Sequence, residues 1–422
     1  MIEFQTGKLL VHTLATGALA AAVLAAPARA CAQNAILEWN EIATQFIVVP
    51  SQSPVQQTRL MAIVHVAMHD AVSGITGEYE QYVPGSPAFE GMSVEAAAIG
   101  AAHRALQGAL KDPPGLAAKL AASLAAHGLS AADPDVMFGR SAADRILALR
   151  ENDGASVAAY PFVPSNAGEL GVWAPLGTQT SLLSGWGGVT PFVLRSAAQF
   201  RPDPPPALES EQYARDYNEV LLVGAATSHI RTGEQQQIAQ FWRASPTALW
   251  NPILRRALVM RGDDLSSTAR VMALFYLAAS DASVACWEAK YVYNFWRPQV
   301  AIARGDEDGN DGTIGAAGWR PLIDTPPHPD YVSGHTANSG AMAFVLRSVF
   351  GNQPGYVIEA RSSTAPGFVR YWETFSEGVD EVVDARVYSG IHFRTADVAG
   401  ARLGRQVAQF VLHHALRVSR GR

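Results

Sequence analysis

Residues 290–298 read KYVYNFWRP, an aromatic and apolar stretch that carries two cations, Lys290 and Arg297. If the stretch is one helix, seven positions correspond to about 700° of rotation, so the two side chains lie about 20° apart around the axis and about 10 Å apart along it. Both can then face one object. An isolated Lys/Arg pair more often lays its methylene stems on apolar surface and its charges in water. The pair therefore indicates a binding site only if other residues of such a site accompany it.

Helical patterns extend on both sides of this stretch. Residues 35–150 contain Ala-rich amphipathic segments such as RLMAIVHVAMHDAVSGI and VEAAAIGAAHRALQGALK. Helical spacing resumes from about Glu209 to Trp296, and two further helices follow Ser333 and Gly390. Because alternating strand-like patterns are scarce, we predict an all-α fold made of two packed four-helix-bundle-like halves.

The segment 154–206 differs from the rest because it is rich in Gly and Pro with scattered aromatic residues. So long an irregular stretch in a compact protein is more often functional than idle, so we expect it to lie over a site as a lid or wall. The predicted division is an N-terminal helical region, 31–206, followed by a C-terminal helical bundle, 207–422. An Ala-x-x-Asp-Ala pattern occurs in both, at Asp70 and Asp281, although it is too short to prove duplication.

The composition limits the classes of function. The chain has 422 residues, of which 48% are hydrophobic, and its net charge is −6 without a long basic run, which disfavours nucleic acid as a partner. Residues 1–30 read as a cleaved signal peptide, so we expect a secreted or periplasmic protein; a retained N-terminal anchor is the alternative. We expect no membrane span in the mature chain. Cys31 and Cys286 supply no disulfide framework.

Two further segments supply partners for the cations at 290 and 297. In TPPHPDYVSGHTANSG, Ser333 and Gly334 lead into a helix with His335 in its first turn. Free N–H groups and the helix dipole make such a turn an anion site. An ordinary Ser N-cap is the alternative for this segment.

The second segment is DARVYSGIHFRTADVAG, which contains Arg386 and His392. On one helix these side chains lie about 120° from facing each other, but Ser389 and Gly390 predict a turn that brings both to one centre. Alone, His392 would be better explained as a structural histidine. Together the three segments hold three side chains expected to be permanently cationic, two histidines, a hydroxyl and a helix N-terminus. Burying so much positive charge requires a partner, so we predict a site for a multiply charged oxyanion, either phosphate or vanadate.

The spacings match a three-part signature, so the chain resembles the superfamily of vanadium-dependent haloperoxidases and type 2 phosphatidic acid phosphatases. The first part, Lys, six residues and then Arg-Pro, is complete at Lys290, Arg297 and Pro298. In the second part, Pro-Ser-Gly-His, Val332 replaces the proline before 333–335. The resemblance covers about residues 210–412 and is strongest at these motifs.

The third part, Ser-Arg, five residues, His and then Asp after three more, departs from the pattern. It appears as Ala385, Arg386 and His392, with Ala396 at the position of the Asp and Asp397 one residue later. Phosphatases of this superfamily use that Asp to orient a histidine nucleophile, so the departure weakens a phospho-histidine mechanism unless Asp397 or a distant carboxylate replaces it. The context of Trp287, PPHPDY and GIHFR is similar to that of soluble bacterial haloperoxidases.

The resemblance implies a role for each matching residue. His392 would be the nitrogen ligand of vanadium, and His335 the acid–base group. Lys290 would polarise the peroxide. The oxyanion oxygens would be held by Lys290, Arg297, Ser333, Gly334 and Arg386. The resemblance further implies hydrogen peroxide, halide and a small organic acceptor as partners, and it leaves a homo-oligomer open.

The residue seven positions before His335 is His328, which resembles the site where fungal chloroperoxidases carry Phe and algal bromoperoxidases carry His. We therefore expect bromide to be favoured over chloride, with Trp287 and His328 in the halide or substrate pocket; a histidine that only caps the PPHP loop is the alternative. Two other functions compete with a haloperoxidase: a soluble acid phosphatase with a phospho-histidine intermediate, and a noncatalytic oxyanion-binding protein.

Overall fold

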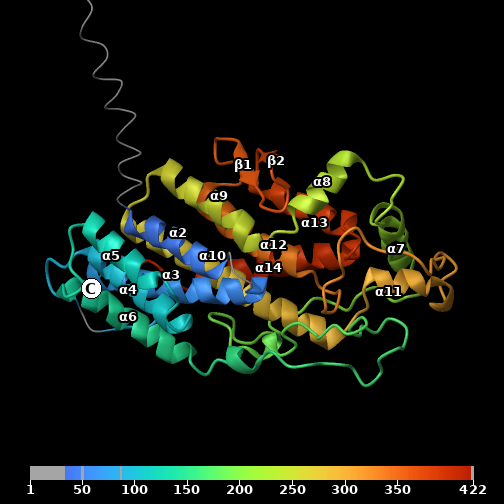
Figure 1. The fold of residues 1–422 in the computed structure, drawn as a ribbon, viewed down its shortest axis with the longest axis horizontal. Coiled ribbons are helices and arrows are strands. Elements are labelled where there is room, and N and C mark those ends of the chain that lie inside the picture. Colours follow the sequence, from blue (N-terminus) through green and yellow to red (C-terminus); the bar gives the residue numbers. More distant parts are fainter. Residues whose placement is uncertain (1–33, 49–51, 86–87, 420–422) are drawn as a thin grey trace, which may run out of the picture.

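The computed structural model describes residues 34–48, 52–85 and 88–419 (Figure 1). The predicted signal peptide, residues 1–30, and Cys31 lie outside the described residues. The fold is mostly helical, as predicted, and its core is continuous along the molecule. The division into two four-helix-bundle-like halves, at residue 207, stays a prediction.

The first group of helices follows the Ala-rich sequence patterns. α3, α4 and α6 pack against one another, and α2 and α5 contact α4. Their starts follow local chemistry: the Asn34 side chain accepts hydrogen bonds from two free N–H groups of α2, and the Ser93 hydroxyl accepts one from α4. The bounds are α2 (Ala35–Ile47), α3 (Pro54–Thr76), α4 (Val94–Ala109), α5 (Leu116–Ala126) and α6 (Pro134–Arg150).

The second group is built around the long helix α10. α10 packs against α3 of the first group and against α12 and α14, and α12 packs on α14 and α13. The bounds are α7 (Glu211–Val223), α8 (Gly233–Phe241), α9 (Pro246–Arg261), α10 (Leu265–Tyr293), α11 (Pro298–Ala303), α12 (Gly334–Phe350), α13 (Phe375–Tyr388) and α14 (Arg394–His414), with 3-10 turns η1 (Ala155–Val157), η2 (Trp186–Gly188) and η3 (Gly305–Glu307).

One small sheet was not predicted from the sequence. β1 (Ile358–Arg361) and β2 (Val369–Trp372) form an antiparallel pair in which Ile358 lies opposite Trp372. Both of these side chains are buried, and the Trp372 ring stacks on Trp242 and Trp250. Strands of four residues are too short for a periodicity of two to stand out from the background, so packing on the tryptophans decides this element.

α10 is the core helix of the molecule. By length and composition it could cross a membrane, but 94% of its most apolar window is buried inside the protein. Its burial on all sides explains why it reads as apolar all round rather than as amphipathic.

The irregular segment 154–206 is anchored along α10. The buried carboxylate of Asp281 accepts hydrogen bonds from the N–H groups of Phe192, Val193 and Leu194, at 2.6 to 2.9 Å. In the same way Asp70 of α3 accepts from Tyr82 and Val83 at 2.6 and 2.8 Å. The two Ala-x-x-Asp-Ala patterns thus share a structural role, because each Asp holds an irregular segment against a core helix.

The expectation that Lys290 and Arg297 share one helix was wrong. α10 ends at Tyr293, and Asn294 adopts the left-handed conformation with φ of 47° while its N–H caps the Lys290 carbonyl. Arg297 is extended and is the N-cap of α11, since the residue before a proline is disfavoured in the helical region. The two cations therefore reach one region through a break in the helix and not through helical spacing.

α12 and α14 approach each other closely because three glycines lie in their contact. A Cβ on Gly404 would lie 1.9 Å from the Ala337 carbonyl oxygen, and one on Gly340 would lie 2.4 Å from that of Ala401. A Cβ on Gly400 would lie 2.5 Å from the Ser333 carbonyl oxygen. This contact fixes the start of α12, with Ser333 and His335, relative to the segment that precedes α14 and contains His392.

Candidate functional site

Lys290 is fully buried in the last turn of α10. Its ammonium donates hydrogen bonds to the carbonyl oxygens of Pro329 and Asp330 at 2.6 and 3.0 Å. Burial lowers the pKa of Lys290 to about 7. Near neutral pH the charge of Lys290 therefore depends on what binds beside it.

Arg297 lies at the centre of the site and is 1% exposed. It donates to the carbonyl oxygens of His328 and Ile391, at 2.8 and 2.6 Å. One terminal nitrogen lies 2.9 Å from Nδ1 of His328, and the other lies 3.1 Å from Nε2 of His392. Burial lowers the pKa of Arg297 to about 10, so the guanidinium stays charged at neutral pH.

The start of α12 presents polar groups that lack partners. Ser333 is the N-cap residue, but its hydroxyl makes no capping hydrogen bond, and its buried Oγ accepts none either. Nε2 of His335 is also buried without a partner. Burial and, next, the nearby Arg386 hold the pKa of His335 well below its ordinary value, so the ring is neutral. The alternative of an ordinary Ser N-cap is therefore contradicted by the structure.

Arg386 and His392 meet as the Ser389–Gly390 turn predicted. Gly390 has φ of 75° and ends α13, which carries Arg386 in its last turn. Arg386 donates to the Trp242 carbonyl oxygen at 2.9 Å, whereas its Nε is buried without a partner. Burial, followed by Arg297 and Lys290, holds the pKa of His392 well below its ordinary value, so this ring is also neutral.

Two buried carboxylates accompany the cations. Oδ1 of Asp330 lies 2.7 Å from Nδ1 of His392 and 3.7 Å from Arg297, and burial raises the pKa of Asp330 to about 7. Asp397 is fully buried near Ser333 and Arg386, and burial raises its pKa well above the ordinary value. The sequence predicts no role for Asp330, because 62 positions separate it from His392 and no spacing rule joins them.

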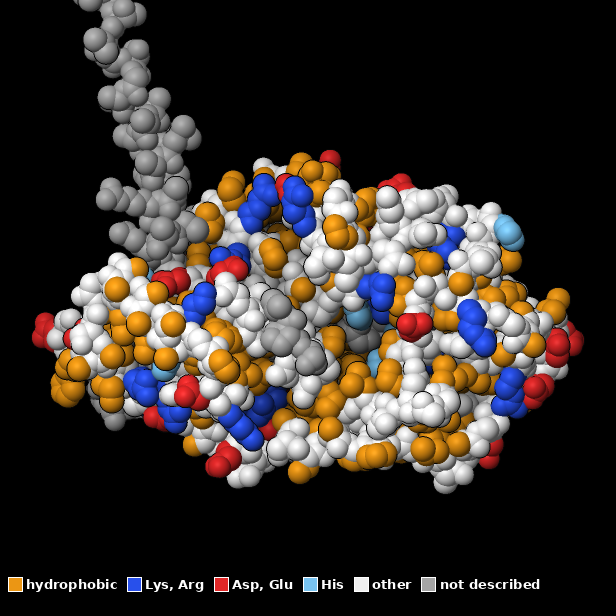
Figure 2. Space-filling view, viewed as in Figure 1, with side chains coloured by type: hydrophobic (Ala, Val, Ile, Leu, Met, Phe, Trp, Pro, Cys, Tyr) orange, Lys and Arg blue, Asp and Glu red, His pale blue; other side chains and the backbone are white. Residues whose placement is uncertain are grey.

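Trp287 and His328 form one wall of the site. Their ring centroids are 5.0 Å apart at an interplanar angle of 41°, and the Lys290 ammonium lies 5.8 Å from the Trp287 ring. The irregular segment contributes here, since the Leu182 carbonyl accepts from Trp287 Nε1 at 3.2 Å and its N–H donates to Pro327 at 2.8 Å. The segment is thus a wall beside this site. Figure 2 shows a hollow near the centre of one face with histidine side chains inside it.

Comparison with known proteins adds independent observations. Residues 270–421 match the family described as the VCPO second helical-bundle domain. Vanadium chloroperoxidase of Curvularia inaequalis is 27% identical over 203 residues, which cover 40% of this chain and 33% of that protein. The match thus spans about a third of the length of this relative.

Solved structures extend the similarity to nearly the whole chain. A bacterial vanadium-dependent iodoperoxidase superposes with a TM-score of 0.78 at 26% identity, covering 92% of this chain and 97% of that one. The chain is thus similar to vanadium haloperoxidases, in sequence over residues 270–421 and in fold over nearly its whole length. The apo and holo forms of a bacterial vanadium-dependent chloroperoxidase, with TM-scores of 0.69 and 0.67, each cover 87% of this chain and 96% and 94% of their own, and at 18% identity they support the fold alone.

The residues of this site suit an oxyanion. Among the described residues, no group of three or more His, Cys, Asp or Glu side chains could hold a metal ion directly. The site instead combines cations with unpartnered buried atoms, namely Ser333 Oγ, His335 Nε2 and Arg386 Nε. Unpartnered buried polar atoms are rare in folded proteins, and these three would be satisfied by the oxygens of one tetrahedral anion such as vanadate or phosphate.

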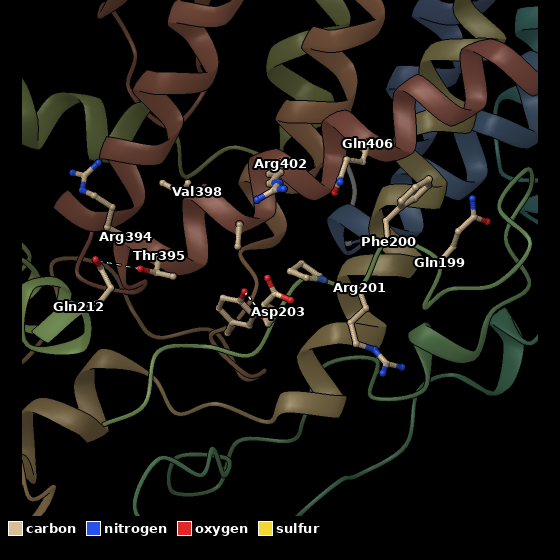
Figure 3. Close-up of a pocket in the computed structure, with 13 residues that line it drawn as sticks. Gln199, Phe200, Arg201, Asp203, Gln212, Arg394, Thr395, Val398, Arg402 and Gln406 are labelled. Carbon is tan, nitrogen blue, oxygen red and sulfur yellow. Dashed lines mark hydrogen bonds between the residues drawn. The ribbon is translucent and has the colours of Figure 1, made fainter. Parts of the chain in front are cut away.

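A cavity of about 750 Å³ lies elsewhere on the same haloperoxidase fold (Figure 3). It separates α14 from the loop at 199–203, and of the nine site residues predicted from the sequence none is among its lining residues. Tyr331 lines it, while Asp330, the residue before it, belongs to the oxyanion site. This cavity is therefore distinct from the site formed by the three sequence segments.

Proposed function

We propose that this protein is a vanadate-dependent haloperoxidase that oxidises halide with hydrogen peroxide to hypohalous acid. The observation that carries the proposal is that Lys290, Arg297 and Arg386 are buried together around one neutral histidine, His392, beside unpartnered polar atoms. A neutral imidazole nitrogen and a set of cations are the donors that a vanadate ion needs. Vanadate, when bound, supplies Lewis-acid activation of hydrogen peroxide.

The surrounding residues provide binding and proton transfer. Arg297, Arg386, Ser333 and the amide of Gly334 would bind oxyanion oxygens, and His392 would supply the nitrogen ligand. His335 is neutral and its Nε2 is free, so this nitrogen can take the proton that hydrogen peroxide loses. Lys290 gains its proton fully only beside an anion, and its ammonium would then polarise the peroxide toward halide attack.

We further infer that bromide is favoured over chloride and that the mature protein acts outside the cytoplasm. His328 supports the halide preference, since its ring lies against Trp287 and within 2.9 Å of Arg297. The alternative role of His328, as a cap of the PPHP loop, has less support because the ring contacts site residues. Export is supported by the apolar leader of residues 1–30.

A bromination assay tests the proposal. Purified, phosphate-free protein is given hydrogen peroxide, bromide and monochlorodimedone before and after addition of orthovanadate. We expect activity only after vanadate addition, and we expect His392→Ala to lose it while Gly318→Ala, in a turn with no atom near the added methyl group, keeps it. Equal bromination without vanadate, or full activity in His392→Ala, would contradict the proposal.

A phosphatase is the second candidate, and one observation favours it. Asp330 lies against His392 and could orient a histidine nucleophile in place of the Asp that Ala396 replaces. Turnover of a chromogenic phosphomonoester that vanadate abolishes, without bromination, would establish this candidate in place of the first.

A further inference from the structure

The surroundings of His392 restrict its protonation state. Nδ1 lies 2.7 Å from Oδ1 of Asp330, which is the distance of a hydrogen bond, and the two side chains are 2% and 1% exposed. The backbone N–H of Phe393 is a second donor beside the Asp330 carboxylate. While Asp330 is ionised, a proton on Nδ1 gives this buried carboxylate a donor, whereas a lone pair on Nδ1 would face a second lone pair at this distance.

Arg297 lies closer to the other ring nitrogen, Nε2, than to Nδ1. One terminal nitrogen of Arg297 lies 3.4 Å from Nδ1 and 3.1 Å from Nε2. A guanidinium only donates hydrogen bonds, so a proton on Nε2 would face a donor and find no acceptor there. Both nitrogens thus favour one tautomer, with the proton on Nδ1 and the lone pair on Nε2.

Asp397 does not share this position. It lies near Ser333 and Arg386. Asp330 comes from the segment before α12, so it reaches His392 only through the tertiary fold. The two buried carboxylates therefore have separable effects.

We propose that Asp330 is the positioning residue of His392, which fixes the ring tautomer so that the lone pair of Nε2 is available to the oxyanion site. Groups that accept from the second nitrogen of a ligating histidine orient the ring and raise its basicity. The part of this inference that concerns vanadate rests on the proposed function, while the tautomer is a property of the protein alone.

The tautomer is measured first, without vanadate. Protein labelled with 15N-histidine gives ring nitrogen shifts by long-range proton–nitrogen correlation, and His392→Gln assigns the resonances. In the wild-type protein we expect Nδ1 protonated and Nε2 unprotonated. In Asp330→Ala we expect a mixture or the opposite tautomer, whereas Asp397→Asn, an equal change in charge at an equally buried carboxylate, should leave the tautomer unchanged.

Binding is measured second, by titration calorimetry with orthovanadate and separately with inorganic phosphate. We expect Asp330→Ala to weaken vanadate binding by about 10- to 100-fold. Asp330→Asn keeps the shape of the side chain and one acceptor oxygen, so it should preserve the tautomer and lose less affinity for vanadate. If the alanine variant fails to fold, vanadate affinity is measured on the asparagine variant.

Two results would overturn the inference: a wild-type His392 with its proton on Nε2, or an unchanged tautomer in Asp330→Ala. Failure of the proposed function looks different. Wild-type protein that never brominates, yet shows the Asp330-dependent tautomer and binds phosphate, would reject the haloperoxidase and keep Asp330 as the positioning residue.

Discussion

Lys290 shows how one residue balances stability against binding. The folded protein holds this ammonium in a site where burial lowers its pKa from 10.5 to about 7. Between these pH values the unfolded chain binds more protons than the folded chain, so this group makes the unliganded protein more stable as pH rises through that window. At and below pH 7 the full penalty of the buried charge is present. An anion in the site would remove much of that penalty.

Lys290→Met should therefore stabilise the unliganded protein while weakening the site. At pH 7 we expect a gain of about 1–3 kcal/mol in the free energy of unfolding, reduced by the loss of the bonds to Pro329 and Asp330. Urea unfolding measures it, and the gap from wild type should narrow as pH approaches 10. Vanadate affinity should fall at least tenfold. A variant less stable than wild type at pH 7 would contradict this account.

His328 offers a test of halide preference. His328→Phe keeps an aromatic ring against Trp287 but removes the nitrogen that lies 2.9 Å from Arg297. We expect the ratio of kcat/KM for bromide to that for chloride to fall about tenfold, because one lost polar contact is of the order of 1.4 kcal/mol. His328→Gln, which retains polar atoms, is the matched control. An unchanged ratio in the phenylalanine variant would remove His328 from halide selection.

At the scale of elements, the site depends on how closely α12 and α14 pack. Ser333 and His335 begin one of these helices, and His392 lies two residues before the other. Gly340, Gly400 and Gly404 allow the backbones to touch. Protein interiors are densely packed, so an added methyl group here must move one of the two helices. The site residues at the start of that helix would move with it.

Gly404→Ala should consequently affect both stability and binding. We expect a loss of about 2–3 kcal/mol in the free energy of unfolding, since the new Cβ would meet the Ala337 carbonyl oxygen at 1.9 Å. Vanadate affinity should fall together with stability. Gly318→Ala, which adds the same methyl group where no atom lies within 4 Å, is the control for thermal unfolding and calorimetry. Equal stability of the two variants would show that the helices can separate freely.

At the scale of the whole molecule, the buried carboxylates Asp70 and Asp281 fasten irregular segments to the two central helices. Asp281 accepts three backbone N–H groups at residues 192–194, although burial still raises its pKa from 3.8 to about 6. The folded state then binds the proton more readily than the unfolded chain. Stability from this group falls as pH rises from about 4 to about 6.

Asp281→Asn should loosen the wall of the site. The amide cannot accept from all three N–H groups, so we expect a loss of about 2–3 kcal/mol at pH 7. The difference between wild type and variant should also change by about 1.4 kcal/mol per pH unit between pH 4 and pH 6. Urea unfolding across this range measures both. A difference independent of pH would mean that Asp281 does not titrate in this window.

The sequence alone identified the residues that we propose to carry the chemistry. The three segments were identified by the spacing of their lysine, arginine, serine and histidine residues, and helical periodicity predicted the mostly helical fold. Both spacing and periodicity are local properties of the amino-acid sequence. The turn at Ser389–Gly390 was also local, since few residues other than Gly accept the φ of 75° found there.

Only the tertiary structure decided how those residues act. It broke the helix at Asn294, lowered the pKa of Lys290 by burial, left Ser333 without a cap partner and brought Asp330 to His392 from 62 positions away. It also formed the β1–β2 pair on buried tryptophans. Burial and contact depend on what the rest of the chain places around a residue, and no spacing along the sequence contains that information.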